Sequence, residues 1–171
     1  MKESDLDRAF AEKVRDCREF QSWITNRTKF REISDSLHLL DKEQAESKPR
    51  KNPDNWWRHW WCRLEDGTES ETDIFLVFSV LGTHERVALH VEDKPPHGEF
   101  TPRQYENYER RAHFMSGKNQ FMNYGEYTTV LLAPMAFAER NADKVAHFDV
   151  FISYEDVAEH VEMFSTALRE A

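Results

Sequence analysis

Residues 74–80 read IFLVFSV, an apolar run interrupted only by Ser79. The run is rich in β-branched and aromatic side chains and does not alternate with polar residues, which is typical of a strand buried on both faces. Such a strand belongs in a sheet that other elements cover on both sides. This segment therefore favours a layered α/β protein over an open antiparallel sheet.

Three segments have the spacing or the boundary signals of helices. Apolar residues recur every three or four positions over residues 5–27, with Ser4 or Asp5 available as the N-cap. A Thr-Pro pair is expected to open a second helix over residues 101–114, since a hydroxyl cap and an N1 proline favour a helix start. Ser153 is expected to cap the last helix.

The strands alternate with these helices in a definite order. Residues 41–55 are polar with two prolines and are expected to form a loop. The order helix, three strands, helix, two strands, helix predicts an α/β fold with a mixed central β-sheet flanked by helices. The strands are expected at residues 56–64, 74–80, 87–91, 127–132 and 147–153.

Length and composition narrow the class of protein. At 171 residues the chain is expected to form one domain, residues 1–171. Cys17 and Cys62 lie far apart and fit no metal-binding spacing, so they are expected to be free thiols in a reducing cytoplasm. The start of the chain lacks the apolar core of a signal peptide, and no apolar run is long enough to span a bilayer.

The net charge of −9 argues against a non-specific nucleic-acid binder, because phosphate neutralisation supplies most of that affinity. Residues 48–63 are nevertheless locally basic. Their cations Lys48, Arg50 and Lys51 either contact phosphate or belong to a solvated loop. The tryptophans in this part of the chain either stack on bases or pack against the sheet, with neighbours alternating between faces; they are Trp56, Trp57, Trp60 and Trp61.

Polar residues mark the point where two neighbouring strands meet. Asp73 precedes the apolar strand, and Glu92 and Lys94 end the next one. Antiparallel strands joined by a short turn place the start of one beside the end of the other, so Asp73 and Glu92 should meet at one edge. Glu92 and Lys94 are two residues apart and point to one face. Two carboxylates beside an ammonium suit a Mg²⁺ site with a group that handles water.

This pattern resembles the PD-(D/E)xK nuclease superfamily, in which an Asp on one strand precedes (D/E)-x-K on the next. Here the second element reads Glu92-Asp93-Lys94, whereas the first reads Thr72-Asp73 and lacks the usual proline. The resemblance extends over most of residues 5–168. It implies a restriction-endonuclease-like core with Asp73 and Glu92 as metal ligands, the Asp93 carbonyl as a third ligand, and Lys94 as the catalytic lysine.

The resemblance also assigns roles to two helices. Many members carry Q-x-x-x-Y on the helix after the lysine, and Gln104 and Tyr108 match it, which implies that they orient the metal shell or a phosphate. They could instead form an ordinary surface pair, four apart on a helix. Members also place a Glu on the first helix, and Glu12 matches best, as a metal ligand directly or through water. Asp16 and Glu19 lie on that helix too.

The function expected from the resemblance is Mg²⁺-dependent hydrolysis of phosphodiester bonds in DNA, with Mn²⁺ as a substitute. A second hypothesis is a catalytically inactive binding or regulatory module on the same fold. The acidic balance and the lack of a DNA-recognition domain favour it. The chain is expected to act as a homodimer or with a partner protein that supplies DNA binding.

Overall fold

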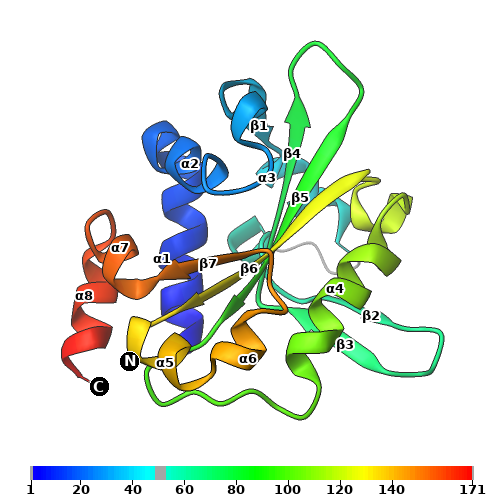
Figure 1. The fold of residues 1–171 in the computed structure, drawn as a ribbon. Helices are drawn as coiled ribbons and strands as arrows, with labels where there is room; N and C mark the ends of the chain where they lie inside the picture. The colour runs from blue at the N-terminus through cyan, green and yellow to red at the C-terminus, as the bar shows by residue number, and fades with distance from the viewer. Residues whose placement is uncertain (1, 49–52, 171) are drawn as a thin grey trace.

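A five-stranded sheet forms the centre of the protein (Figure 1). The computed structural model describes residues 2–48 and 53–170. Neighbouring strands follow the order β1-β4-β5-β6-β7, with β1 antiparallel to β4, β4 antiparallel to β5, and β5, β6 and β7 mutually parallel. The predicted α/β fold with a mixed sheet is therefore confirmed. The strands are β1 (Leu37–Leu39), β4 (Ile74–Val80), β5 (Arg86–Asp93), β6 (Glu126–Ala133) and β7 (Val150–Ser153).

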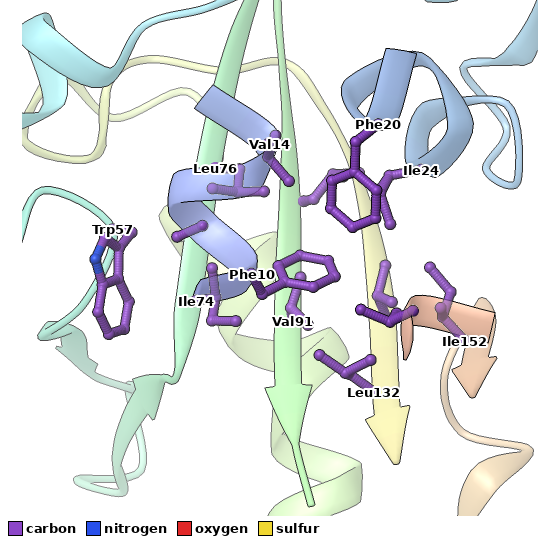
Figure 2. Close-up of a cluster of buried hydrophobic side chains, with 14 of the residues drawn as sticks. Phe10, Val14, Phe20, Ile24, Trp57, Ile74, Leu76, Val91, Leu132 and Ile152 are labelled. Carbon is purple, nitrogen blue, oxygen red and sulfur yellow. The ribbon is translucent and has the colours of Figure 1, made fainter. Parts of the chain in front are cut away.

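Helices cover both faces of this sheet. Helix α1 (Glu3–Asp16) lies across one face, where Phe10 packs among side chains of β4, β5 and β6, including Val91 and Leu132 (Figure 2). Helix α4 (Gln104–Met115) covers the opposite face, where Tyr108 packs with Leu131. The successive residues Leu131 and Leu132 therefore enter different cores, as the alternation of a strand requires. Both faces of the central strands are apolar for this reason.

The remaining helices lie around the edges and ends of the sheet. Helix α2 (Arg18–Thr25) follows α1, and α7 (Tyr154–Ala158) and α8 (Glu162–Arg169) pack beside the same core. None of the described helices is long and apolar enough to cross a membrane. The other helical segments are α3 (Asp41–Ser47), α5 (Met135–Arg140), α6 (Ala142–Val145) and the 3-10 turns η1 (Arg31–Ser36), η2 (Pro53–Asn55) and η3 (Asn119–Phe121).

The bounds of all three predicted helices differ from expectation. The helix expected over residues 5–27 breaks at Cys17, whose extended backbone (φ −130°, ψ 104°) separates α1 from α2, and its N-cap is Lys2 rather than Ser4 or Asp5. Helix α4 begins two residues later than expected, at Gln104 instead of Pro102. Its N-cap Arg103 is left-handed, with φ 61°, and no side chain caps the first turn. Ser153 does cap a helix, since its hydroxyl accepts the backbone N–H of Asp156 at 3.0 Å. That helix is α7, however, and the extended backbone of Val161 (φ −134°, ψ 101°) separates it from the last helix, α8.

The segment between residues 41 and 72 differs most from expectation. Residues 41–47 form helix α3 rather than a loop, and residues 49–52 lie outside the described part of the chain. The expected strand 56–64 shortens to β2 (Trp60–Arg63), which pairs with β3 (Glu69–Thr72) as a separate two-stranded sheet (Figure 1). Side chains from α3 and this region complete the outer edge of β4, which the short β1 covers only in part.

The side chain of Gln44 pairs with part of the outer edge of β4. Its amide donates to the Phe75 carbonyl at 3.0 Å and accepts the Val77 N–H at 2.9 Å, as a neighbouring strand would. The Phe75 N–H bonds to the carbonyl of Trp57, and the Val77 carbonyl accepts the N–H of Leu40. A buried strand edge is thus paired without a further strand, which removes a site for edge-to-edge association.

Candidate active site

Asp73 and Glu92 meet at one end of the sheet. Strands β4 and β5 are antiparallel with Ile74 opposite Val91, so the residue before Ile74 lies opposite the residue after Val91. Asp73 Oδ2 accepts the backbone N–H of Asp93 at 3.0 Å, which holds its carboxylate against the end of β5. The predicted meeting of Asp73 and Glu92 is therefore what the strand register produces.

Lys94 and Gln104 both bind the Glu92 carboxylate. Lys94 Nζ lies 2.5 Å from Glu92 Oε1, and Gln104 Nε2 donates to the same oxygen at 2.6 Å. Glu92 is fully buried (0% exposed), and among the described residues its second oxygen, Oε2, has no hydrogen-bond partner. A buried carboxylate oxygen without a donor is unfavourable unless a proton, a cation or water reaches it.

Burial and neighbouring charges shift the pKa values of Glu92, Asp73 and Lys94. Desolvation, followed by the charge of Asp73, raises the pKa of Glu92 well above its usual range. Desolvation also raises the pKa of Asp73, against the opposing charge of Lys94. Burial disfavours the charged form of Lys94, but the neighbouring acids Glu92, Asp73 and Glu3 together outweigh that effect and raise the lysine pKa. Lys94 is therefore a cation at neutral pH, which suits charge stabilisation better than proton abstraction from water.

Tyr108 and Arg111 support the site from α4. The Tyr108 hydroxyl donates to the Val91 carbonyl at 3.2 Å and accepts the Asp73 N–H at 3.4 Å, so it joins the two strands at the point where the acids meet. The Arg111 guanidinium stacks on the Tyr108 ring, 3.8 Å from its centroid, and donates to the Glu71 carbonyl. Gln104 and Tyr108 are thus both turned toward the sheet and do not form a surface pair.

A second group of acids lies on the other face of β5. Asp93 follows Glu92 and therefore points toward α1, where the Tyr154 hydroxyl donates to its Oδ1 at 2.5 Å. The buried Asp7 of α1 is close enough to Asp93 to feel its charge, and among the described residues neither Asp7 Oδ1 nor Asp93 Oδ2 has a hydrogen-bond partner, which favours a proton on at least one of the two carboxyls. Burial, followed by the charge of Asp93, raises the pKa of Asp7 to about 10. Glu3, one turn earlier, also acts on Asp73 electrostatically.

The structure does not bring Glu12 to the site. Its side chain is 41% exposed and lies 3.9 Å from Arg8 on the outer surface of α1. The acid that α1 turns toward the sheet is Asp7. The sequence holds a signal for it, because Asp7 falls on the buried stripe, three residues before Phe10 and seven before Val14. Asp16 and Glu19 are exposed and also lie away from the sheet.

The basic segment and the tryptophans occupy mostly internal positions. Lys48 is buried and donates to the carbonyls of Asn55 and Arg58, so it is neither solvated nor turned toward a phosphate. Burial lowers its pKa to about 8. Arg50 and Lys51 lie outside the described residues. Three tryptophans are buried, and Trp61 alone is exposed (56%); the buried ones are Trp56, Trp57 and Trp60. Alternation between faces holds for Trp60 and Trp61 in β2, whereas Trp56 and Trp57 precede the strand.

The donor set can be compared with what a cation needs. The carboxylates of Asp73 and Glu92 and the main-chain carbonyl of Asp93 are hard oxygen donors of the kind that Mg²⁺ and Mn²⁺ prefer. The unpartnered Glu92 Oε2 is an acceptor that a cation would satisfy. Within residues 2–48 and 53–170, no group of three or more Asp, Glu, His or Cys side chains is arranged to hold a metal ion. Water and substrate oxygens would therefore complete the shell, as is common for Mg²⁺.

Comparisons with known proteins found no match for this chain. No protein-family model matches the sequence, and no curated protein or solved structure is significantly similar to the chain. Membership of the PD-(D/E)xK superfamily therefore stays a prediction from the motifs at Asp73, Glu92, Lys94, Gln104 and Tyr108.

Proposed function

We propose that the protein is a divalent-metal-dependent nuclease of the PD-(D/E)xK type that hydrolyses phosphodiester bonds, with DNA as the favoured substrate. The observation that carries the proposal is the convergence of Asp73, Glu92 and Lys94 at one end of β4 and β5, with Gln104 bound to Glu92. The antiparallel pair followed by parallel strands, with α1 and α4 on opposite faces, supports a restriction-endonuclease-like core.

Each residue has a task that follows from its position. A cation bound by Asp73, Glu92 and the Asp93 carbonyl would lower the pKa of bound water and offset charge on the phosphate. Gln104 fixes the rotamer of Glu92 by donating to Oε1, which leaves Oε2 free for the ligand. The Lys94 ammonium lies where it can bind a phosphate oxygen as negative charge develops during attack.

Cleavage of DNA by wild-type and variant proteins tests this proposal. Plasmid and linear DNA are incubated with the protein in Mg²⁺, Mn²⁺ or EDTA. We expect Asp73→Asn and Lys94→Ala to lower the cleavage rate about 10²–10³-fold, because each removes a group that stabilises the transition state. Glu12→Gln is the matched control, since that carboxylate is exposed and pairs only weakly with Arg8. Cleavage that survives both site variants, with their folds intact by circular dichroism, would rule out this site.

A catalytically inactive module on the same fold is the second candidate, and two observations favour it. Glu92 is already paired with Lys94, and the chain carries a net charge of −9. Calorimetric titration with Mg²⁺ and Mn²⁺ separates the two candidates. Heat of binding that disappears in Asp73→Asn supports the nuclease, whereas a folded wild type that binds no cation supports the inactive module.

The compartment and the oligomeric state of the proposed nuclease are inferred from its cysteines and from the need to cut two strands. Cys17 and Cys62 are both free thiols, which supports a reducing compartment and hence the cytoplasm. Cutting both strands of a duplex requires a second active site or a second binding event. We therefore propose a homodimer or a complex with a DNA-binding partner, and light scattering with and without duplex DNA distinguishes these from a monomer.

A further inference from the structure

A polar cavity opens beside the candidate active site. It has a volume of about 540 Å³ and lies between the loop after β5 and helices α5 and α6. The loop and the two helices follow the carboxyl ends of β5 and β6, the same end of the sheet that carries Glu92 and Lys94 (Figure 1). We call this cavity the Arg140 pocket; its lining residues are Pro96, His97, Gly98, Glu99, Phe100, Arg140, Asn141 and Lys144.

Cationic groups dominate the chemistry of the Arg140 pocket. Within the described part of the chain, neither Arg140 nor Lys144 forms an ion pair with a carboxylate. Arg140 Nη2 donates to the Pro96 carbonyl at 3.3 Å, and Lys144 Nζ donates to Asn141 Oδ1 at 3.3 Å. Glu99 is the carboxylate of the lining, and it is exposed. Two cations that face one hollow suit an anion with several oxygens.

The ring of Phe100 connects the Arg140 pocket to the candidate active site. Lys94 Nζ lies 5.6 Å from the centroid of this ring, and Lys144 Nζ lies 5.9 Å from the same centroid. The half-buried ring packs edge-on against Tyr105 and Phe137 and is therefore held in place. The ammonium groups of Lys94 and Lys144 thus both lie 5.9 Å or less from the centroid of one ring, so a single strand is long enough to supply an anion to each.

The wall of the pocket is rigid before any ligand arrives. The Gly98 N–H bonds to the Pro95 carbonyl at 2.7 Å and closes a tight turn. A Cβ at residue 98 would lie 3.0 Å from that carbonyl oxygen, which is tighter than most Cβ contacts, so a larger residue would require a small shift of the turn. The preceding Pro95-Pro96 pair restricts the loop further. A fixed wall lowers the entropy lost on binding.

We propose that the Arg140 pocket binds a phosphate group of a polynucleotide strand, next to the phosphate that Lys94 faces. The pocket then sets the position of the strand along the surface, while the residues at β4 and β5 act on the neighbouring phosphodiester. This inference deepens the proposed nuclease function and rests on it for the position of the cut. The binding of phosphate by Arg140 and Lys144 does not depend on a metal.

The test measures binding and cleavage separately. The variant Arg140→Gln/Lys144→Gln removes both charges and keeps side-chain length. Arg31→Gln/Lys42→Gln removes the same charge from exposed positions near β1, at the opposite edge of the sheet. Binding of a labelled 20-nucleotide strand and its duplex is followed by fluorescence anisotropy in EDTA. We expect about tenfold weaker binding and a salt dependence shallower by one to two counterions (about one per phosphate contact) for the pocket variant alone.

Cleavage distinguishes failure of this inference from failure of the proposed function. In Mn²⁺ the pocket variant should lose plasmid cleavage but keep hydrolysis of bis(p-nitrophenyl) phosphate, which offers a scissile diester and no neighbouring phosphate. Asp73→Asn should lose both activities. If Asp73 proves essential and the pocket variant binds and cuts DNA like the wild type, the nuclease stands and the Arg140 pocket has no such role.

Other outcomes also decide the question. Wild-type protein that does not bind the strand in EDTA overturns the inference, whatever its activity in Mn²⁺. Displacement of the strand by inorganic phosphate or a mononucleotide at equal phosphate concentration would assign the pocket to a free phosphate compound instead. Loss of both DNA and small-diester hydrolysis in the pocket variant would show that Arg140 and Lys144 support the active site rather than a separate phosphate.

Discussion

The buried carboxyl group of Asp7 allows us to predict how the free energy of unfolding depends on pH. Asp7 and Asp93 are both buried between α1 and the end of β5, and burial beside another carboxyl favours the protonated form of Asp7. Burial and the Asp93 charge raise the pKa of Asp7 from about 4 in the unfolded chain to about 10 in the folded protein. The change to test is Asp7→Asn, which keeps the shape and supplies a permanent N–H donor to Asp93.

The sign and size of the effect follow from proton linkage. Between about pH 4 and pH 10 the folded protein holds a proton on Asp7 that the unfolded chain has released. The free energy of unfolding therefore falls as pH rises, and one proton corresponds to about 1.4 kcal/mol per pH unit. The contribution is complete below about pH 4 and is lost by about pH 10. Asp7→Asn removes this slope, so relative to wild type it should gain about 3 kcal/mol between pH 5 and pH 7.

Urea unfolding, followed by fluorescence of the buried tryptophans in EDTA, measures this directly at pH 5, 6 and 7. Glu12→Gln is the control on the same helix. Its carboxylate is exposed, so its curve should run parallel to that of the wild type. The reasoning is refuted if Asp7→Asn also runs parallel to the wild type, because Asp7 would then be ionised in both states.

Three further substitutions test how the sheet is held. Gln44→Leu should lower the free energy of unfolding by about 2–4 kcal/mol in urea titration, because it leaves the Phe75 carbonyl and the Val77 N–H unpaired. Phe10→Ala should lower it by about 3–5 kcal/mol by the same measurement, since the ring is fully buried between α1 and the sheet. Ser153→Ala should lower it by about 1 kcal/mol, seen as a small drop in melting temperature, through loss of the cap on α7.

Strands β4, β5 and β6 could be predicted because their signals are local, whereas the three-residue β1 was missed and β7 begins three residues later than expected. Residues 74–80 are apolar at almost every position, and they form β4 with the expected bounds. The turn that follows is short, so β5 returns antiparallel, and the pairing of Asp73 with Glu92 follows from that register. Gln104 could be placed by its spacing after Lys94, although the helix start could not. The left-handed backbone of Arg103 has no signal in the sequence, and it overrides the Thr-Pro pair.

The errors arise where tertiary contacts decide the structure. Helix α3 is polar and carries little periodicity, and its one buried residue is Gln44, which bonds to β4. Its charge predicts Lys48 at the surface, yet the residue is buried and its ammonium group donates to the carbonyl groups of residues 55 and 58. The spacing of the family motif favours Glu12, whereas the periodicity of α1 turns Asp7 toward the sheet. In each case a polar side chain is buried by bonds to residues that are distant in the sequence or lie on another element.

The end of β5 buries one carboxyl group on each face of the sheet, and the two groups have different neighbours. Glu92 enters the α4 layer beside a lysine, and Asp93 enters the α1 layer beside another acid. Replacing such groups by apolar ones would favour folding, because unpaired buried charge is unfavourable. Stability therefore gives no reason for this arrangement, whereas the proposed binding of a cation and a phosphate would. Because Asp7 keeps its proton in the folded protein, Asp7→Asn exchanges one neutral group for another and should leave Mn²⁺ binding at Asp73 and Glu92 unchanged in calorimetric titration, even though it stabilises the fold. Weaker Mn²⁺ binding in this variant would show that Asp7 is ionised in the folded protein and adds to the negative potential at Asp73.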